Sequence, residues 1–361
     1  MKIVITGGHH SPALAVVDEL VRTGKIKSLE EIYWFGHKYS VWGDRNVSAE
    51  YEEVLERKIK FIDLHAGKIY RTFNPLKLIR LPLGLLQSLA ALMKIKPELI
   101  ISFGGYLAFP VVISGWLLRV PIATHEQTMV CGLANRLIAL FANKVFISWP
   151  QSAKYFPPVK TVLTGNPVRS AIFHRRDGLF SFPENRRDLR TLYVTGGKQG
   201  SHFINELVRQ CLIDLLKNFN IIHQSGRVSF YNDRRNIEEL VQGLPEQLKN
   251  GYILKDFFNE AEIGSVFGLA DIIVSRSGAN TVYEIALLGK PAILIPIPWS
   301  SHNEQKENAL FLGRLGSAIL LEQNELTPAK LVEACLKINS KYDSYRSSAK
   351  LAKQYVRADA A

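Results

Sequence analysis

A turn of small residues, Arg276-Ser277-Gly278-Ala279-Asn280, has the residue types in this sequence that best suit ligand chemistry. It follows an apolar, β-branched run, Ile272 to Ser275, that is typical of a strand buried in a parallel sheet, and it opens a helix. The free N–H groups and the positive dipole end at that helix start favour an anion, most simply a diphosphate. Glu284, about one turn into the helix, can accept hydrogen bonds from the hydroxyl groups of a sugar such as ribose. The alternative is that Gly278 only makes a tight turn and that Glu284 is a solvated carboxylate.

Two further glycine turns follow predicted strands. Gly196 to Ser201 opens a helix and carries Lys198 as a positive charge for a phosphate. The turn does not match G-x-x-x-x-G-K-[ST], which argues against a nucleoside triphosphatase. Near the N-terminus, Thr6 to Ser11 follows the strand at residues 2–5. His9 in that turn can serve as a general base near neutral pH, or it can cap the helix that follows.

Two more strand ends in the N-terminal half carry polar or glycine-rich segments. The strand at residues 99–102 ends in Phe103-Gly104-Gly105-Tyr106, and the strand at 122–124 ends in His125-Glu126-Gln127. The carboxyl ends of parallel strands share one edge of a sheet, where open α/β folds bind their ligands. We therefore expect these segments and His9 to form an active-site rim.

The elements that position these residues alternate between strands and helices, which predicts α/β domains with parallel sheets. A length of 361 residues is enough for two such domains, each with its own core. Gly165 to Arg169 contains glycine and proline and is predicted to be the hinge. We predict an N-terminal domain at 1–164, a C-terminal domain at 165–338, and a C-terminal helix at 339–361 that can pack back on the N-terminal domain.

The composition, with 47% hydrophobic and 22% charged residues, is that of a folded protein. The net charge of +12 indicates an anionic partner or is a solubility feature. We expect no nucleic acid, because no helix-turn-helix, zinc or base-stacking signature is present. Three distant cysteines predict neither a disulfide framework nor a cysteine zinc site, and they fit a reducing cytoplasm.

Membrane contact is expected to be peripheral. The first residues run directly into a strand, which argues against a signal peptide, and no uncharged apolar run reaches the roughly 20 residues that span a bilayer. Between Lys68 and Lys96, however, apolar residues are interleaved with basic ones, including Arg71, Lys77 and Arg80. Such a mixture suits an anionic membrane surface. The alternative is a core helix with a basic outer face.

In these segments the chain resembles the MurG glycosyltransferase family, whose members transfer N-acetylglucosamine from UDP-N-acetylglucosamine to lipid I, a polyprenyl-diphosphate-linked muramoyl-pentapeptide, to form lipid II. The similarity covers nearly the whole length. The motifs occur in the family's order and are G-G-H-x-x-P-A-L-A, F-G-G-Y, H-E-Q with G-L-A-N-R, G-N-P-V-R, G-G-x-Q-G, R-S-G-A-x-T-V-x-E and Q-x-x-N-A.

The resemblance implies the GT-B fold, in which two Rossmann-like domains with parallel sheets face each other across a cleft. It implies an acceptor and membrane site on the N-terminal domain and a UDP-sugar site on the C-terminal domain. By motif it puts the uracil near the backbone of Phe258, the ribose on Glu284, and the sugar hydroxyls near Gln305 and Ala279-Asn280. The diphosphate would lie at Ser277, Gly278, Ala279, Asn280 and Thr281 and in the Gly196-Gly197 loop. Other matching donor-site residues are Arg169, Gly197, Lys198, Gln199, Asn205 and Arg276.

On the N-terminal domain the resemblance implies catalytic roles for His9, Tyr106, His125 and Glu126, and substrate contacts for Gly7, Gly8, Thr128 and Asn135. His9 would take the proton of the attacking acceptor hydroxyl, and the anomeric configuration would invert. The helix start would stabilise the departing UDP. No tightly bound cofactor or metal is expected, divalent-cation dependence stays open, and the protein would act at the cytoplasmic face of the cell membrane.

Three departures from the family pattern leave alternatives open. The first glycine loop is short, Lys198 replaces a serine, and Thr128 replaces an asparagine. The acceptor could therefore be another polyprenyl- or lipid-linked molecule. A UDP-sugar 2-epimerase of the same fold and a non-enzymatic nucleotide-sugar binder are the remaining alternatives.

Overall fold

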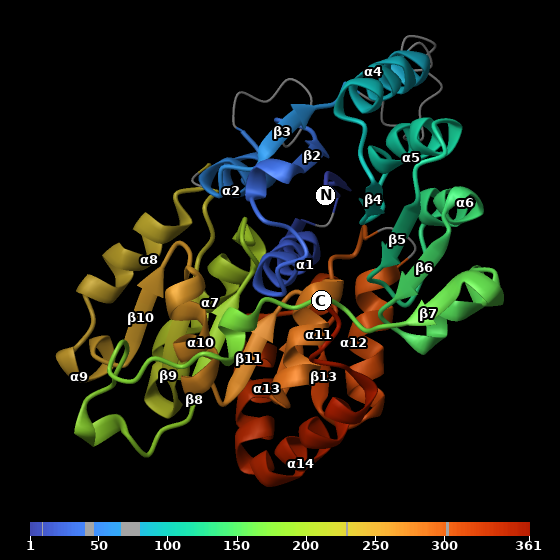
Figure 1. The fold of residues 1–361 in the computed structure, drawn as a ribbon. Coiled ribbons are helices and arrows are strands. Elements are labelled where there is room, and N and C mark those ends of the chain that lie inside the picture. The colour runs from blue at the N-terminus through green and yellow to red at the C-terminus, as the bar shows by residue number, and fades with distance from the viewer. Residues whose placement is uncertain (9, 40–46, 66–79, 229, 301–302) are drawn as a thin grey trace. The chain divides into compact units, whose positions relative to one another are not determined.

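The computed structural model describes residues 1–8, 10–39, 47–65, 80–228, 230–300 and 303–361 (Figure 1). These residues form two α/β units, as the sequence predicts. The first unit comprises Met1–Arg169 with Arg357–Ala361, and the second comprises Ser170–Val356. The division thus falls five residues beyond the expected end of the N-terminal domain, and only the last five residues return to it.

The first unit is a parallel sheet of seven strands in the order β3-β2-β1-β4-β5-β6-β7. The strands are β1 Ile3–Thr6, β2 Ile32–Gly36, β3 Lys60–Asp63, β4 Leu99–Ser102, β5 Ile122–Glu126, β6 Lys144–Ile147 and β7 Thr161–Leu163. The helices are α1 His10–Arg22, α2 Ala49–Glu56, α4 Arg80–Ile95, α5 Ala108–Leu117 and α6 Leu133–Phe141. The strand order reverses between β1 and β4, which brings the glycine turns after these two strands together.

Alternation along β1 explains the two-sided core of this unit. Ile3 and Ile5 pack with Leu14 of α1, whereas Val4 between them packs on the other face with Val111 of α5. Helices α1 and α2 thus cover one face, and α4, α5 and α6 cover the other (Figure 1).

The second unit is a parallel sheet of six strands in the order β10-β9-β8-β11-β12-β13. The strands are β8 Thr191–Thr195, β9 Asn220–Gln224, β10 Tyr252–Lys255, β11 Ile272–Ser275, β12 Ala292–Leu294 and β13 Ala318–Leu320. The helices are α7 His202–Asn218, α8 Asp233–Gln242, α9 Glu246–Lys249, α10 Glu260–Leu269, α11 Ala279–Leu288, α12 Glu304–Arg314, α13 Pro328–Ser340 and α14 Tyr342–Ala352. The order reverses between β8 and β11, so the turns that follow these two strands are neighbours.

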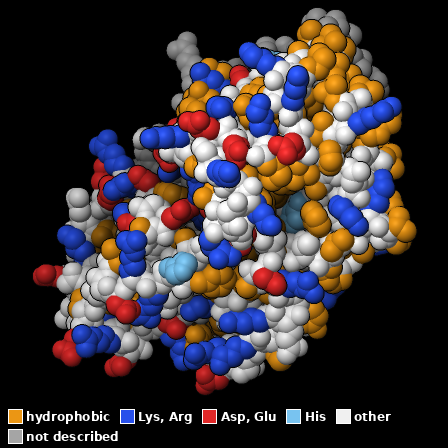
Figure 2. Space-filling view, viewed as in Figure 1, with side chains coloured by type: hydrophobic (Ala, Val, Ile, Leu, Met, Phe, Trp, Pro, Cys, Tyr) orange, Lys and Arg blue, Asp and Glu red, His pale blue; other side chains and the backbone are white. Residues whose placement is uncertain are grey.

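Exposed apolar side chains gather on α4, α5 and α6 of the first unit (Figure 2). We call them the apolar surface; they are Leu83, Leu86, Met93, Trp116, Leu117, Leu133, Leu137 and Leu140. Among the described helices none is long and apolar enough to cross a membrane.

Candidate active site

Arg276 joins the two neighbouring turns of the second unit. Its guanidinium donates from Nη2 to the hydroxyl oxygen of Ser201 at 2.9 Å and from Nη1 to the carbonyl oxygen of Ile295 at 3.1 Å. The side chain is buried, and this burial lowers its pKa to about 10. No carboxylate of the described chain lies within ion-pair distance of it. A buried guanidinium without a carboxylate is suited to receive an anionic ligand.

Helix α11 begins beside Arg276 without a side-chain cap. Its N-cap residue is Gly278, and a side chain added there would meet open space. The hydroxyl of the buried Ser277 donates to the carbonyl oxygen of Gln305 at 2.7 Å, and Asn308 donates to the carbonyl oxygen of Ser277 at 3.0 Å. Ser277 is therefore used to hold the turn, while the amides of the first turn are the groups suited to a phosphate.

The side chain of Gln305 is oriented by a hydrogen bond to the backbone of Ile297. Its side-chain oxygen accepts the backbone N–H of Ile297 at 3.1 Å, which leaves the amide NH2 group as the donor available to a ligand. Ala279 is buried, whereas Asn280, Thr281 and Glu284 are half-buried. Asn280 and Glu284 are four residues apart and lie on the same side of α11.

The Gly196–Ser201 turn has a backbone fixed by Gln224. The amide of this buried side chain donates to the carbonyl oxygen of Gly197 at 3.0 Å, and its oxygen accepts the N–H of Phe258 at 3.1 Å. Gly197 has a φ of +89°, a conformation that favours glycine. On the same turn, Lys198 is half-buried and Gln199 is exposed.

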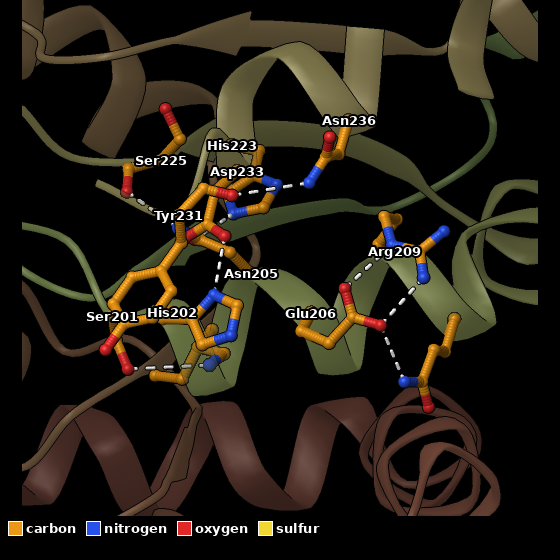
Figure 3. Close-up of polar contacts among 12 residues, drawn as sticks. Ser201, His202, Asn205, Glu206, Arg209, His223, Ser225, Tyr231, Asp233 and Asn236 are labelled. Atoms are coloured by element: carbon orange, nitrogen blue, oxygen red, sulfur yellow. Dashed lines mark hydrogen bonds and ion pairs between the residues drawn. The ribbon is translucent and has the colours of Figure 1, made fainter. Parts of the chain in front are cut away.

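Asn205 lies in a polar network beside the start of α7 (Figure 3). Its amide nitrogen donates to the carbonyl oxygen of Ser225 at 2.9 Å and to the Asp233 carboxylate at 2.8 Å. Its oxygen is 3.1 Å from Nε2 of His223. Asp233 in turn lies 2.6 Å from Nδ1 of His202. Asn205 is 2% exposed, so its side chain is suited to support Ser225, Asp233 and His223 and not to contact a ligand itself.

In the first unit the two glycine turns touch backbone to backbone. Gly8 has a φ of +133°, and a Cβ there would lie 2.7 Å from the carbonyl oxygen of Gly104. Gly104 has a φ of +79°, and a Cβ there would collide with the amide of Asn135. Glycine is therefore required at both positions.

Asn135 also holds Glu126. Its amide nitrogen donates to Oε2 of Glu126 at 2.9 Å, and the backbone N–H of Thr128 donates to Oε1 at 2.9 Å. His125 precedes Glu126 on β5 and points to the opposite face, where Nε2 lies 3.0 Å from the carbonyl oxygen of Gly165. The structure thus brings Glu126, Thr128 and Asn135 together and separates His125 from them.

Matches to known families decide to which class of protein the chain belongs. The glycosyltransferase family 28 N-terminal domain matches residues 6–147, and the glycosyltransferase family 28 C-terminal domain matches residues 191–361. A UDP-N-acetylglucosamine–N-acetylmuramyl-(pentapeptide) pyrophosphoryl-undecaprenol N-acetylglucosamine transferase of Clostridium kluyveri is 33% identical over 361 residues, which cover 95% of this chain and 93% of the relative. The chain belongs to glycosyltransferase family 28. The Treponema denticola protein of the same name is 35% identical, with 90% of this chain and 83% of that relative covered.

Solved structures agree with this family 28 fold. Acinetobacter baumannii MurG superposes with a TM-score of 0.68 at 22% identity, covering 100% of this chain and 97% of that one. The UDP-GlcNAc 2-epimerase of Neisseria meningitidis superposes with a TM-score of 0.66 at 15% identity, with the same coverage. The fold is thus shared with epimerases. The family matches identify this chain as a glycosyltransferase and confirm the resemblance to MurG and the GT-B-like fold.

The other residues expected at the family 28 active site differ in burial and surroundings. His9 and residues 66–79 lie outside the described residues. Gly7 is buried at the end of β1, and Tyr106 is half-buried, with its pKa raised by loss of solvation and by the negative charge of Glu50. Arg169 is the last residue of the first unit, and its Nε is buried with no partner within the described chain. No group of three or more His, Cys, Asp or Glu that could hold a metal occurs in the part of the chain that the structure describes.

The sequence analysis missed Glu50, Gln224, Asp233 and Asn308. Asn308 belongs to the Q-x-x-N-A motif, so a signal for it was present. Gln224 and Asp233 reach their partners only through the fold, and no local pattern marks them.

Proposed function

We propose that this family 28 enzyme transfers N-acetylglucosamine from UDP-N-acetylglucosamine to lipid I and thereby forms lipid II. The observation that carries the proposal is the buried Arg276 guanidinium, which bridges two turns beside the uncapped start of α11 and has no carboxylate partner in the described chain. A diphosphate supplies the missing negative charge. The names of the Clostridium kluyveri and Treponema denticola relatives support the sugar and the acceptor.

The donor would bind along the carboxyl edge of the second sheet. We assign the diphosphate to the amides at 278–281 and to the Gly196–Ser201 turn, with Lys198 beside it. The uracil would meet the backbone at Phe258, whose N–H is already engaged by Gln224, so its carbonyl oxygen is the group available. Glu284 would bind the ribose, and the amide NH2 of Gln305 would bind sugar hydroxyls.

Transfer would follow an in-line displacement. The acceptor hydroxyl oxygen forms the new bond to the anomeric carbon, and the bond from that carbon to the β-phosphate oxygen breaks, so the configuration inverts. We assign His9 the role of base that removes the hydroxyl proton. The negative charge that develops on the leaving UDP would be stabilised by the α11 amides and Arg276.

Membrane attachment would be peripheral, at the cytoplasmic face, through the apolar surface of α4–α6. Exposed basic side chains border it at Lys94, Arg119 and Arg136, and the half-buried Lys160 adds to them. Aromatic and aliphatic side chains beside lysine and arginine suit an interface with anionic headgroups.

The test is transfer of radiolabelled N-acetylglucosamine from its UDP donor to purified lipid I, with UDP release measured in parallel and His9→Ala as the variant. We expect lipid II from the native chain and little from the variant. UDP release without lipid II would retain the donor site and point to another polyprenyl-linked acceptor. Absence of both products would contradict the proposal.

A further inference from the structure

Helix α2 reaches across the ends of β1 and β2 and places Glu50 beneath the first glycine turn. Oε1 of Glu50 accepts the indole N–H of the buried Trp34 at 2.6 Å. A Cβ at Gly7 would lie only 1.6 Å from the same oxygen, and a Cβ at Gly36 would lie 2.8 Å from it. The Glu50 side chain therefore occupies the space that side chains at these two glycines would need.

The charge of Glu50 is directed toward the same turn. Its carboxylate interacts electrostatically with His10 and His37, and its negative charge is one cause of the raised pKa of Tyr106. Removal from water raises the pKa of Glu50 itself, which means that burial of its charged form costs free energy.

A second carboxylate of α2 engages the far end of the turn. Glu53 is three residues after Glu50 and hence on the same side of the helix, and its Oε2 lies 3.3 Å from Nε2 of His10. Glu50 thus supports the first residue of the turn, Gly7, while Glu53 pairs with the residue that begins α1. His9 lies between these two anchors in the sequence.

We infer that Glu50 is a positioning residue of the transfer reaction, which fixes the Gly7-Gly8 part of the first glycine turn through packing at Gly7 and through its negative charge. The inference rests on the proposed function only in assuming that this turn serves the acceptor. It assigns no contact between Glu50 and the substrates.

The test compares Glu50→Gln with Glu56→Gln, which makes the same chemical change at an exposed position of the same helix. Glutamine can still accept the Trp34 N–H, so the folded state should persist. For Glu50→Gln we expect kcat for transfer to lipid I to fall between about tenfold and about a hundredfold, as for a small misplacement of a catalytic segment. The KM for UDP-N-acetylglucosamine and the melting temperature should stay at native values, and Glu56→Gln should match the native chain throughout.

A second readout does not depend on the acceptor. Amide hydrogen exchange in the peptide that contains Gly7 and Gly8 should be faster in Glu50→Ala than in the native chain, and unchanged in Glu56→Ala. A native kcat in Glu50→Gln, a loss of kcat that only follows a fall in melting temperature, or native exchange in Glu50→Ala would overturn the inference. If the native chain forms no lipid II, the proposed function fails, and the exchange experiment still decides whether Glu50 orders the turn.

Discussion

The side-chain oxygen of Gln224 accepts the backbone N–H of Phe258 at 3.1 Å. Because the amide of the same side chain donates to the carbonyl oxygen of Gly197, one buried residue connects the glycine turn after β8 to the segment after β10. Both segments belong to the proposed donor site, so the geometry of one depends on the other.

Gln224→Leu should lower the free energy of unfolding by about 1 to 3 kcal/mol, because it leaves the buried N–H of Phe258 without its partner and removes one of the two donors to the Gly197 carbonyl oxygen. UDP affinity should fall as well. Urea denaturation and calorimetric titration with UDP measure the two effects. Gln210→Leu, at an exposed position of α7, is the control and should change neither. Native UDP affinity in a folded Gln224→Leu protein would separate Gln224 from the donor site.

Arg276→Met should weaken ligand binding much more than it changes the stability of the ligand-free protein. UDP binding should weaken by about 1.5 to 3 kcal/mol, the range for hydrogen bonds to a charged group. The unliganded protein should stay close to native stability, because removal of a buried charge that lacks a carboxylate partner offsets the loss of the hydrogen bonds that the guanidinium donates to Ser201 and Ile295. Melting temperatures with and without UDP measure both effects. A UDP-induced shift equal to that of the native protein would contradict a role for Arg276 in anion binding, and Arg187→Met, at an exposed position, should leave the shift unchanged.

His223 should make the second unit sensitive to acid. Burial lowers its pKa from 6.5 to about 3, so the imidazole is neutral in the folded protein and takes a proton on unfolding. Its contribution to stability is therefore complete above about pH 6.5 and is lost as the pH falls toward 3, at about 1.4 kcal/mol per pH unit.

His223→Gln should consequently lose stability less steeply across this range than the native chain, even if it is less stable at neutral pH. Denaturation midpoints at a series of pH values give the slopes. His174→Gln, at an exposed position, should retain the native slope. Equal slopes for His223→Gln and the native chain would remove His223 as the cause.

The apolar surface and its basic border should bind anionic vesicles. Replacing Arg119 and Lys160 by glutamate should weaken binding at least about tenfold, since each basic residue near an anionic surface contributes about 1 kcal/mol. Sedimentation with phosphatidylglycerol-containing vesicles measures binding. Arg235→Glu with Lys249→Glu makes the same charge change at exposed positions of the second unit and should bind as the native chain does. Equal binding by both double variants would contradict this assignment.

Local sequence patterns predicted the parallel α/β units and the glycine turns, because buried strands and helix starts are encoded within a few residues. The pairing of the turns after β8 and β11, and of those after β1 and β4, follows from strand order, which local patterns do not contain. Because β5 continues two residues beyond the predicted strand, its alternation separates the side chains of His125 and Glu126, which the shorter predicted strand did not indicate.

The buried residues that hold these turns in place could not be predicted in the same way. Gln224 reaches Phe258 across 34 positions, and Trp34 reaches Glu50 through a connection that includes undescribed residues. The resemblance placed Asn205 at the donor site, yet its buried amide bonds to His223, Ser225 and Asp233, which only the packing of α7 against β9 and α8 reveals.

In the hydrogen-bond network around Asn205, the donor and the acceptor of each bond are fixed. The Asn205 oxygen can only accept, so Nε2 of His223 must be the protonated nitrogen, and Nδ1 must accept the Tyr252 hydroxyl that lies 2.6 Å away. At the other end, the Asn205 amide and Nδ1 of His202 both donate to Asp233. Each group thus has one permitted role. A carboxylate at Asn205 would still accept from His223, but it would place an acceptor against two other acceptors, the carbonyl oxygen of Ser225 and the carboxylate of Asp233.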